Sequence, residues 1–570
     1  MLTKIVIRNF KLFKNVEIEL GERVVFVGPN NSGKTSALQA LALWDIGTKR
    51  WLEKRGSGEV PAKRPGITIN RRDLITVPVP AANLLWHDLR TQQTKPGGGT
   101  DKIYMEIEVE GVSMGKAWSS ALEFYYANEE SFYCRSKNQP EGGRMEVPSE
   151  AAELRLAYLP PMSGLLASET RLDEGAINVR LGEGRTAEVL RNLCWRVLQG
   201  EEGNVKWDRL AARMTALFGD QIEKPEYVKE RGEVVMSYRN THGIRLDLSS
   251  SGRGQQQTLL LLAHMAANPG AVLLLDEPDA HLEILRQVQI YQLLSETAAE
   301  TRSQIIAASH SEVILNEAAD RDTVVAFIGR PHRIDDRGSQ LLKALKEIGF
   351  EQYIQAEETG WVLYLEGSTD LAILRAFAEK LDHPARAALD RPFVHYVANQ
   401  TAQAKHHFYG LREAKANLVG IAIYDRFDRL LPDPNLAQEM WRRREIENYL
   451  CQRSTLSAFA EAQGREQQGD LFAASWQKAM EGAIEEIAGA LAALAKPDPW
   501  SPDLKVSDEF LDPLFKRFYE KLNLPNIMRK TDYHTLAPFV PASELDAEIG
   551  EKLDRIVEVA ERARPTAGEA

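Results

Sequence analysis

The chain has 570 residues, 44% hydrophobic and 27% charged, with a formal net charge of −12. This length exceeds one compact domain, so we expect two or three, and the composition is that of an ordinary globular protein. The acidic balance argues against a protein that coats nucleic acid with its whole surface, although a local basic groove remains possible. No apolar run reaches the roughly 18 residues that span a bilayer, so we expect no membrane partner.

The amino terminus and the cysteines predict a cytoplasmic location. The first ten residues alternate like a strand and lack the apolar core and cleavage site of a signal peptide. Cys134, Cys194 and Cys451 lie far apart and match neither a disulfide framework nor a zinc site.

A glycine-rich loop lies between a predicted strand and a predicted helix. The segment Gly28–Thr35 fits the phosphate-binding pattern G-x-x-x-x-G-K-[ST], and strong helix formers follow it. Backbone N–H groups at the helix start would cradle phosphates. Lys34 would reach the β- and γ-phosphates, and the Thr35 hydroxyl would bind magnesium. The residues assigned here to ATP binding are Asn30, Asn31, Ser32, Gly33, Lys34, Thr35 and Ser36.

We expect the region up to residue 245 to contain both strands and helices, together with a basic stretch. Eight basic residues between Lys49 and Arg72 form either a DNA contact or a solvated loop, and the sequence leaves both open. We expect an antiparallel strand pair at Lys4–Phe10 and Val16–Leu20. Further strands are expected at 101–110 and 121–126, and helices at 186–198 and 207–218.

Two further strand patterns end in groups that suit ATP hydrolysis. Ala271–Glu277 is an apolar run that stops on two acids, so with the phosphate loop upstream Asp276 would hold magnesium and Glu277 would polarise the attacking water. The strand pattern Gln304–Ser309 leads to His310, where a contact to the γ-phosphate is needed.

Residues 1 to about 340 resemble the ATP-binding-cassette ATPases of the RecF/SMC-like group. Ser250–Gln255 is similar to their signature motif, although its order departs from L-S-G-G-Q, and Pro278–Leu282 is similar to their D-loop. In that family the signature closes over ATP held by a second subunit. The resemblance therefore implies a homodimer or higher homo-oligomer formed through the ATPase heads, with ATP contacts from Ser251, Gly252, Gln255 and Asp279.

The second half contains apolar strands that stop on acids. Trp361–Leu365 is followed by Glu366 and, four residues later, by Asp370; alone, this pattern also fits an ordinary turn between a strand and a helix. Asn417–Tyr424 is followed by Asp425. Alternating strands and helices predict a small parallel sheet, whose carboxyl edge would gather these acids into a site for hard divalent cations.

This half resembles a TOPRIM domain, the acidic module of topoisomerases, DnaG-type primases and OLD-family nucleases. Glu366 and Asp425 match its two acidic strand ends, but Asp428 is displaced by one residue from the usual Asp-x-Asp. Arg444–Leu450 is similar to a segment of OLD-class fusions in which an acid supports a second metal. Lys530 lies in a segment that resembles the one in which those nucleases place a basic residue beside the scissile phosphate. The implied metal ligands are Thr35 and Asp276 in the ATPase, and Glu366, Asp370, Asp425, Asp428, Glu445 and Glu447 here.

The expected fold class is α/β, with an ABC-type P-loop ATPase head followed by a TOPRIM-like parallel α/β domain with helical additions. The expected domains are an ATPase at 1–345 with an insertion at about 47–245, a linker at 346–360, a TOPRIM-like nuclease domain at 361–540 with a helical insertion at about 452–500, and a helix and frayed tail at 541–570.

Together the halves resemble OLD-family (overcoming lysogenization defect), Gabija-like nucleases. The resemblance implies ATP-gated DNA cleavage with magnesium or manganese, in anti-phage defence or DNA processing, with a defence-system partner protein. An ATP-driven DNA clamp or a RecF-like repair ATPase, each with a non-cleaving TOPRIM domain, remains the alternative. The implied catalytic residues are Glu277, His310, Glu366, Asp425 and Lys530.

Overall fold

The computed structural model describes residues 1–56, 66–95, 98–139, 143–319, 321–334, 348–427 and 432–566. The chain forms two compact units, one running to Leu342 and the other beginning at Lys343. Within the described ranges, no helix is both long and apolar enough to cross a bilayer.

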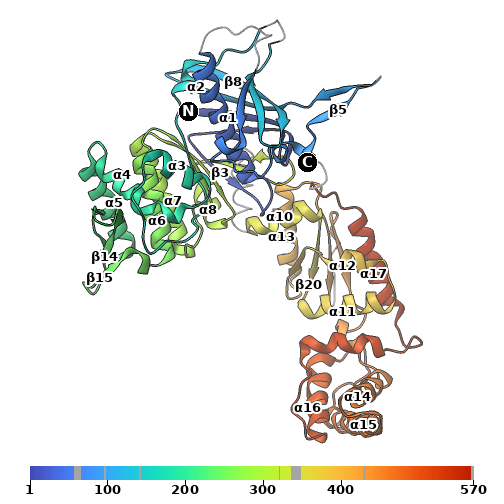
Figure 1. Cartoon of the computed structure of the whole chain (residues 1–570). Helices are drawn as coiled ribbons and strands as arrows, with labels where there is room; N and C mark the ends of the chain where they lie inside the picture. Colours follow the sequence, from blue (N-terminus) through green and yellow to red (C-terminus); the bar gives the residue numbers. More distant parts are fainter. Residues whose placement is uncertain are drawn as a thin grey trace. The chain divides into compact units, whose positions relative to one another are not determined.

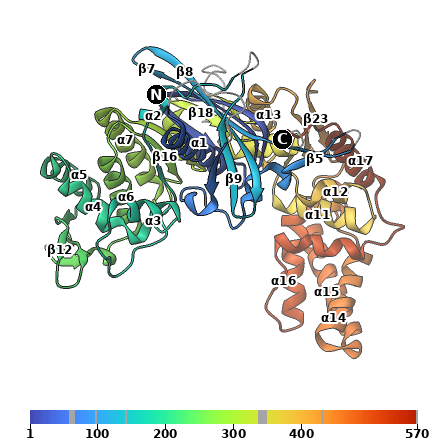
Figure 2. The ribbon, with the colours of Figure 1, turned by 45° about the horizontal axis from the view of Figure 1, so that its top comes forward.

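Helix α1 (Lys34–Arg55) lies between two sheets of the first unit (Figure 2). Leu38, Leu41 and Trp44 are fully buried, as expected for a helix covered on both sides. One sheet is antiparallel, in the order β2-β1-β7-β8-β9-β4. Its strands are β1 (Leu2–Phe10), β2 (Phe13–Glu19), β4 (Ile67–Asn70), β7 (Met105–Ser113), β8 (Lys116–Asn128) and β9 (Ser131–Ser136). The β1–β2 pair confirms the predicted antiparallel strands.

The other sheet carries the phosphate loop on a central strand. Its order is β10-β16-β17-β3-β18-β19, and all of these strands except β19 run parallel. Alternate side chains of β16 and β17 point to α1 on one face and to a helical layer on the other. The strands are β3 (Arg23–Val27), β10 (Leu156–Leu159), β16 (Val272–Asp276), β17 (Gln304–Ser309), β18 (Thr323–Ala326) and β19 (His332–Arg333).

The helical layer packs against that sheet and buries a hydrophobic core separate from the one around α1. The predicted helices at 186–198 and 207–218 are present, but they begin at Leu190 and Gly203. The layer includes α3 (Glu174–Gly182), α4 (Leu190–Gln199), α5 (Gly203–Phe218), α6 (Arg253–Ala267), α7 (Ile284–Thr301) and α8 (Glu312–Ala318). Beside them lie the short strands β11 (Gln221–Ile222), β12 (Glu226–Val228), β13 (Glu233–Val235), β14 (Ser237–Arg239) and β15 (Arg245–Asp247).

A two-stranded ribbon extends from the first unit (Figure 1). It consists of β5 (Gln92–Thr94) and β6 (Thr100–Lys102), which pair antiparallel. At its base the indole of the buried Trp86 donates to the carbonyl of Ile103 at 3.0 Å, which fixes the point where the ribbon leaves the sheet.

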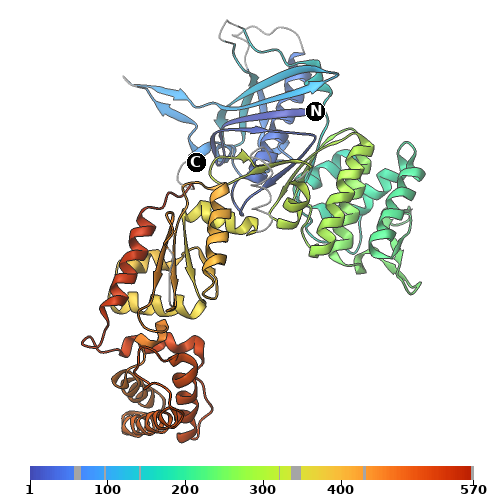
Figure 3. The same cartoon turned by 180° about the vertical axis from the view of Figure 1, so that it is seen from behind.

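The second unit is built on a four-stranded parallel sheet in the order β21-β20-β22-β23 (Figure 3). The sequence predicts β20 and β22. It does not predict β23, because Leu436–Met440 has one apolar residue at each end, an Ala and two polar residues between them, and lacks a strand pattern. The strands are β20 (Trp361–Leu365), β21 (Val394–Tyr396), β22 (Val419–Tyr424) and β23 (Leu436–Met440), and the helices beside them are α10 (Phe350–Thr359), α11 (Ser368–Lys380), α12 (Ala385–Asp390), α13 (Thr401–Ala414) and α17 (Ala547–Glu561).

A helical group shares one hydrophobic core with this sheet. It includes α14 (Arg453–Gln468), α15 (Asp470–Ala493) and α16 (Asp512–Lys521), and Figure 1 shows these helices gathered at one end of the unit. A π-helix at Ser507–Leu511 precedes α16, and a 3₁₀ segment at Lys530–Phe539 follows it.

Two segments at the edges of this unit pack against it. The segment expected as a helical linker contains α10, whose residues Phe350 and Tyr353 are buried. The tail expected to fray is held at Thr566, whose N–H donates to the carbonyl of Glu357 at 2.9 Å. The ammonium of Lys415 bonds both the Glu357 carboxylate, at 2.9 Å, and the Thr566 hydroxyl, at 2.8 Å.

Each of the three hydrophobic cores contains one cysteine. Cys134 lies in the core around α1, Cys194 in the core of the helical layer, and Cys451 in the core of the second unit. All three thiols are free and buried, and burial raises the pKa of each.

Candidate functional site

The phosphate loop has the shape that its sequence predicts. Gly28, Asn31 and Gly33 have φ of 153°, 63° and 102°, values that favour glycine and asparagine. A side chain at Gly33 would come within 2.7 Å of the Phe13 ring, so glycine is required there. The Lys34 ammonium lies across the loop, donating to the carbonyls of Gly28 and Pro29 at 2.8 Å.

Thr35 and Asp276 lie together, as predicted for magnesium ligands. The Thr35 hydroxyl donates to the Asp276 carboxylate at 3.1 Å, across 241 residues of sequence. The Tyr158 hydroxyl donates to the other oxygen at 3.2 Å. Burial raises the pKa of Asp276 to about 6. Tyr158 was missed, because nothing in the sequence of β10 marks it as a neighbour of β16.

Glu277 and His310 face each other at the ends of β16 and β17. The His310 Nδ1 lies 3.9 Å from the Glu277 carboxylate, and both side chains are partly exposed. Glu277 has φ of 49°, a backbone conformation that glutamate rarely adopts and that accompanies functional positions. The geometry suits the predicted roles of a base and a γ-phosphate contact.

The predicted signature lies at the start of α6, next to the D-loop. Gly252 is the N-cap of this helix, and Gly254 lies against Leu282 and the His281 carbonyl. The signature side chains are held from within the unit: the Ser251 hydroxyl donates to the Leu248 carbonyl at 2.8 Å, and the Gln255 amide donates to Asp220 at 3.2 Å.

Buried polar atoms around the phosphate loop lack partners within the described chain. They are Ser32 Oγ in the loop and Asp279 Oδ1 in the D-loop. Ser36 is partly buried in the first turn of α1, and Asn30 is exposed. A buried hydroxyl without a partner in a loop that leads into a helix suits a phosphate ligand, so the residues present fit ATP with magnesium.

A second candidate site lies at the carboxyl edge of the β20–β22 pair. The sheet order reverses here, since the connection from β20 leads to β21 on one side and the chain then returns to β22 on the other, and ligands of open α/β sheets bind at such a point. Glu366 directly follows β20 and Asp425 directly follows β22. Besides burial, which has the larger effect, Glu366 is close enough to Asp425 to raise the pKa of its carboxyl, so the two predicted ligands are neighbours.

Asn399 joins these two acids. Its amide N–H donates to the Glu366 carboxylate, and its carbonyl oxygen accepts the Asp425 backbone N–H at 3.0 Å. Asn399 and Ala398 have φ of 59° and 44°, so the loop after β21 takes a left-handed course that aims Asn399 between the acids. No pattern in the sequence marks this residue as part of the site.

The other predicted ligands near this pair differ in the hydrogen bonds that hold them and in their exposure. Asp370 accepts from the N–H groups of Glu366 and Gly367 at 2.9 and 3.2 Å, so one of its oxygens caps α11. Glu445 accepts from the Ser507 N–H and hydroxyl at 2.5 and 3.0 Å. Glu447 is 6% exposed.

Burial, followed by the charges of neighbouring acids, raises the pKa of several carboxyls at this edge. Burial, then the charges of Glu445 and Asp370, raise the pKa of Glu447 to about 8. Burial raises the pKa of Asp370 to about 6, and burial, with the neighbouring Glu366, raises that of Asp425 well above its usual value. Like charges brought together in this way accompany functional sites.

Two lysines border the acids. The Lys530 ammonium bonds Asp508 of the π-helix, and Lys505 lies 2.7 Å from the same carboxylate. Both lysines act electrostatically on Glu445. Lys505, Asp508 and Ser507 were not predicted, since they follow a helical region with no chemical motif; the π-helix itself marks functional segments.

We call the carboxyl edge of the β20–β22 pair, with its acids, the acidic edge. Its side chains are of the type that binds a divalent cation, but they are not arranged in advance around one position. Carboxylate oxygens are the ligands that Mg²⁺ and Mn²⁺ prefer. Among the described residues, however, no group of three or more His, Cys, Asp and Glu side chains is arranged to hold a metal ion. Asp428 lies outside the described residues.

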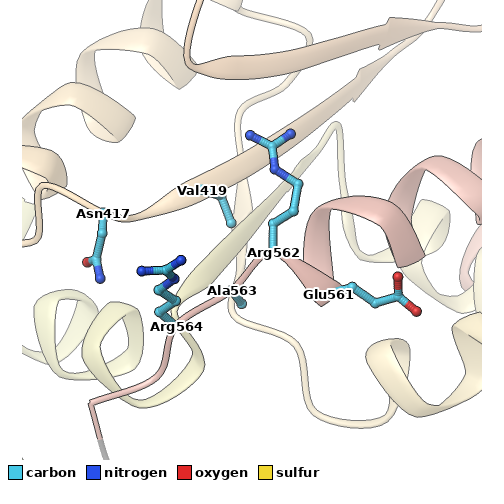
Figure 4. Close-up of a pocket in the computed structure, with 6 residues that line it drawn as sticks. All are labelled: Asn417, Val419, Glu561, Arg562, Ala563 and Arg564. Carbon is cyan, nitrogen blue, oxygen red and sulfur yellow. The ribbon is translucent and has the colours of Figure 1, made fainter.

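A cavity of about 390 Å³ lies beside the start of β22, away from the acidic edge (Figure 4). It is lined by Asn417, Val419 and the segment Glu561–Arg564.

Two family models match parts of the first unit. Residues 1–45 match a family described as "AAA ATPase domain", and residues 185–316 match one described as "AAA domain, putative AbiEii toxin, Type IV TA system". These ranges contain the phosphate loop, the signature, Asp276, Glu277 and His310. No curated protein matches the chain.

Several solved structures align with the chain at low identity. The SMC head domain from Thermotoga maritima is 16% identical over 58% of this chain and 98% of its own, with a TM-score of 0.31. An Smc head domain with an extended coiled coil, bound to the C-terminal domain of ScpA derived from Pyrococcus furiosus, is 14% identical over 61% and 99%, with a TM-score of 0.35.

The family matches and the loop geometry define the class: the first unit carries a P-loop ATPase domain of the AAA type. ATP is therefore its nucleotide, and Thr35 and Asp276 would hold the accompanying magnesium.

Proposed function

We propose that this chain is an ATP-dependent, metal-requiring DNA endonuclease of the OLD type, with the second unit as a TOPRIM-like nuclease domain. The observation that carries the proposal is that Asn399 joins Glu366 and Asp425 at the switch point of a parallel sheet. In this proposal the ATPase heads form a homodimer or higher homo-oligomer, and the chain serves anti-phage defence with a partner protein.

Each group at the acidic edge has a defined part in the proposal. Glu366 and Asp425 would hold the cation, together with Glu447, the free oxygen of Asp370 and Asp428, which lies outside the described residues. A bound divalent cation would supply a water of lowered pKa and stabilise the leaving oxygen. Asn399 fixes the spacing of the two central carboxylates, Glu445 is held by Ser507, and Lys530 neutralises a phosphate oxygen.

The test pairs one substitution in each unit. Glu366→Ala should abolish cleavage of plasmid DNA in magnesium or manganese while ATP turnover stays at the parent rate, because the ATPase residues are untouched. Glu277→Gln should stop ATP turnover. The exposed Glu379 on α11 provides a matched control, and Glu379→Gln should cleave normally. Unchanged cleavage by Glu366→Ala would refute the assigned nuclease site.

An ATP-driven DNA clamp without cleavage is the second candidate. Its support is that the described acids do not form a ready-made metal cage. It predicts that the parent protein retains DNA binding and ATP turnover but yields no nicked or linear plasmid at any manganese concentration.

A further inference from the structure

The β5–β6 ribbon has no core of its own. All six side chains of its two strands are polar, and five of them are exposed. A two-stranded ribbon without an apolar face is at best marginally stable alone. Here it is held by its base, where Trp86 bonds Ile103 and the Ile103 N–H donates to the Thr91 carbonyl at 3.0 Å. The ribbon therefore presents polar side chains rather than packing them.

The two faces of the ribbon differ in charge. The register pairs Gln92 with Lys102 and Thr94 with Thr100, so these four residues share one face. By the same alternation Arg90, in extended backbone, lies on this side. We call these five residues the ribbon face; it has two cations and no acid. Asp101 lies on the opposite face, where it is paired with Lys95 at 2.8 Å.

The lysine of the ribbon face is ordered. The Lys102 ammonium lies 4.4 Å from the ring centre of Tyr125, and Arg135 lies over Tyr104 and Tyr125 at 4.7 and 5.4 Å. Such cation–aromatic contacts hold a charged group in place at a surface. A preplaced cation loses less conformational freedom when it meets a phosphate.

We propose that the ribbon face is a duplex-DNA contact, with the ribbon entering the major groove. That groove, about 12 Å wide, admits a two-stranded β-ribbon. Arginine, glutamine, threonine and lysine are the side chains that bond base edges and phosphates, and the face is positive in a chain of net charge −12. The inference rests on DNA as the substrate of the proposed function.

The experiment measures binding of the full chain to a fluorescently labelled DNA duplex by anisotropy, in EDTA so that cleavage plays no part. The variant Arg90→Ala/Gln92→Ala/Lys102→Ala should bind about tenfold or more weakly. The slope of log affinity against log salt should become shallower by about 2, since two phosphate contacts are lost. ATP turnover should be unchanged, which shows that the variant folds.

The charge-matched control is Lys14→Ala/Lys116→Ala, which removes two exposed lysines elsewhere in the unit and should bind DNA within twofold of the parent. The proposal is overturned if the ribbon variant also binds within twofold, if both variants lose affinity equally, or if the parent does not bind duplex. A ribbon variant that changes only the sedimentation behaviour would instead identify the ribbon as a contact between copies. Binding without cleavage by the parent in magnesium would sink the nuclease proposal and leave this one standing.

Discussion

At the residue scale, the central acids of the acidic edge could be predicted from the positions where the strands end. Glu366 and Asp425 were predictable, because an acid that directly follows a parallel strand must lie at the carboxyl edge of the sheet. Asn399 and Ser507 were not, since each depends on a loop or helix whose course the sequence does not encode in a short pattern. The prediction of the site therefore extended to its acids and Lys530, and it missed Lys505, Asp508 and the groups that position the acids.

The raised pKa values at this edge predict a pH dependence. Glu447, with a pKa of about 8, keeps its proton in the folded unit, whereas the unfolded chain loses it near the ordinary value of 4.5. The folded state then binds more protons, so the free energy of unfolding falls as pH rises between these values. In EDTA, the melting temperature of the second unit should be lower at pH 8 than at pH 6.

Divalent cations should reverse this trend. Manganese competes with the retained protons, so its addition should raise the melting temperature more at pH 8 than at pH 6. Glu447→Gln removes one of the titrating groups and should flatten the pH dependence. A second unit that becomes more stable from pH 6 to pH 8 in EDTA would contradict the assigned protonation.

At the element scale, continuous patterns were predicted well and short edge elements poorly. The buried strands β3, β16, β20 and β22 stand out as apolar runs, because both of their faces are covered. Strand β23 and the C-terminal segment through Thr566 are held by contacts with elements distant in the sequence. No local sequence pattern therefore predicts them.

Gly360 is the joint between α10 and β20, and its replacement should destabilise the second unit. Its φ is 72°, and a Cβ would lie 2.7 Å from the backbone nitrogen of Arg564. Gly360→Ala should therefore cost about 2 kcal/mol or more, measured by chemical denaturation.

A glycine in α17 provides the matched control. Gly550 has open space around its Cβ position, so Gly550→Ala should stabilise by about 0.5–1 kcal/mol through helix propensity. Equal effects of the two substitutions would show that the C-terminal segment does not restrict Gly360.

At the scale of the whole molecule, the cores respect the division into two units. Two cores use residues between Leu2 and Phe327, and the third uses residues between Trp361 and Val559. Each unit thus buries its own apolar surface, which is the condition for folding independently.

Calorimetry of the full chain should show two unfolding transitions with separate ligand responses. ATP with magnesium should raise the midpoint of one, and manganese without nucleotide should raise the other, because each ligand stabilises the unit that binds it. Lys34→Ala should remove the first shift and Glu366→Ala the second. A single transition that responds to both ligands would refute independent folding.

The buried cysteines give the protein three internal reporters. A thiol reacts as its thiolate and only when it is accessible, so Cys134, Cys194 and Cys451 can be alkylated only when their own cores open. The rate of labelling at each position then measures the free energy of opening of one core under native conditions. A tight-binding nucleotide should slow the labelling of Cys134 and Cys194 and leave Cys451 unchanged, so the three rates would resolve how far the effect of each ligand spreads.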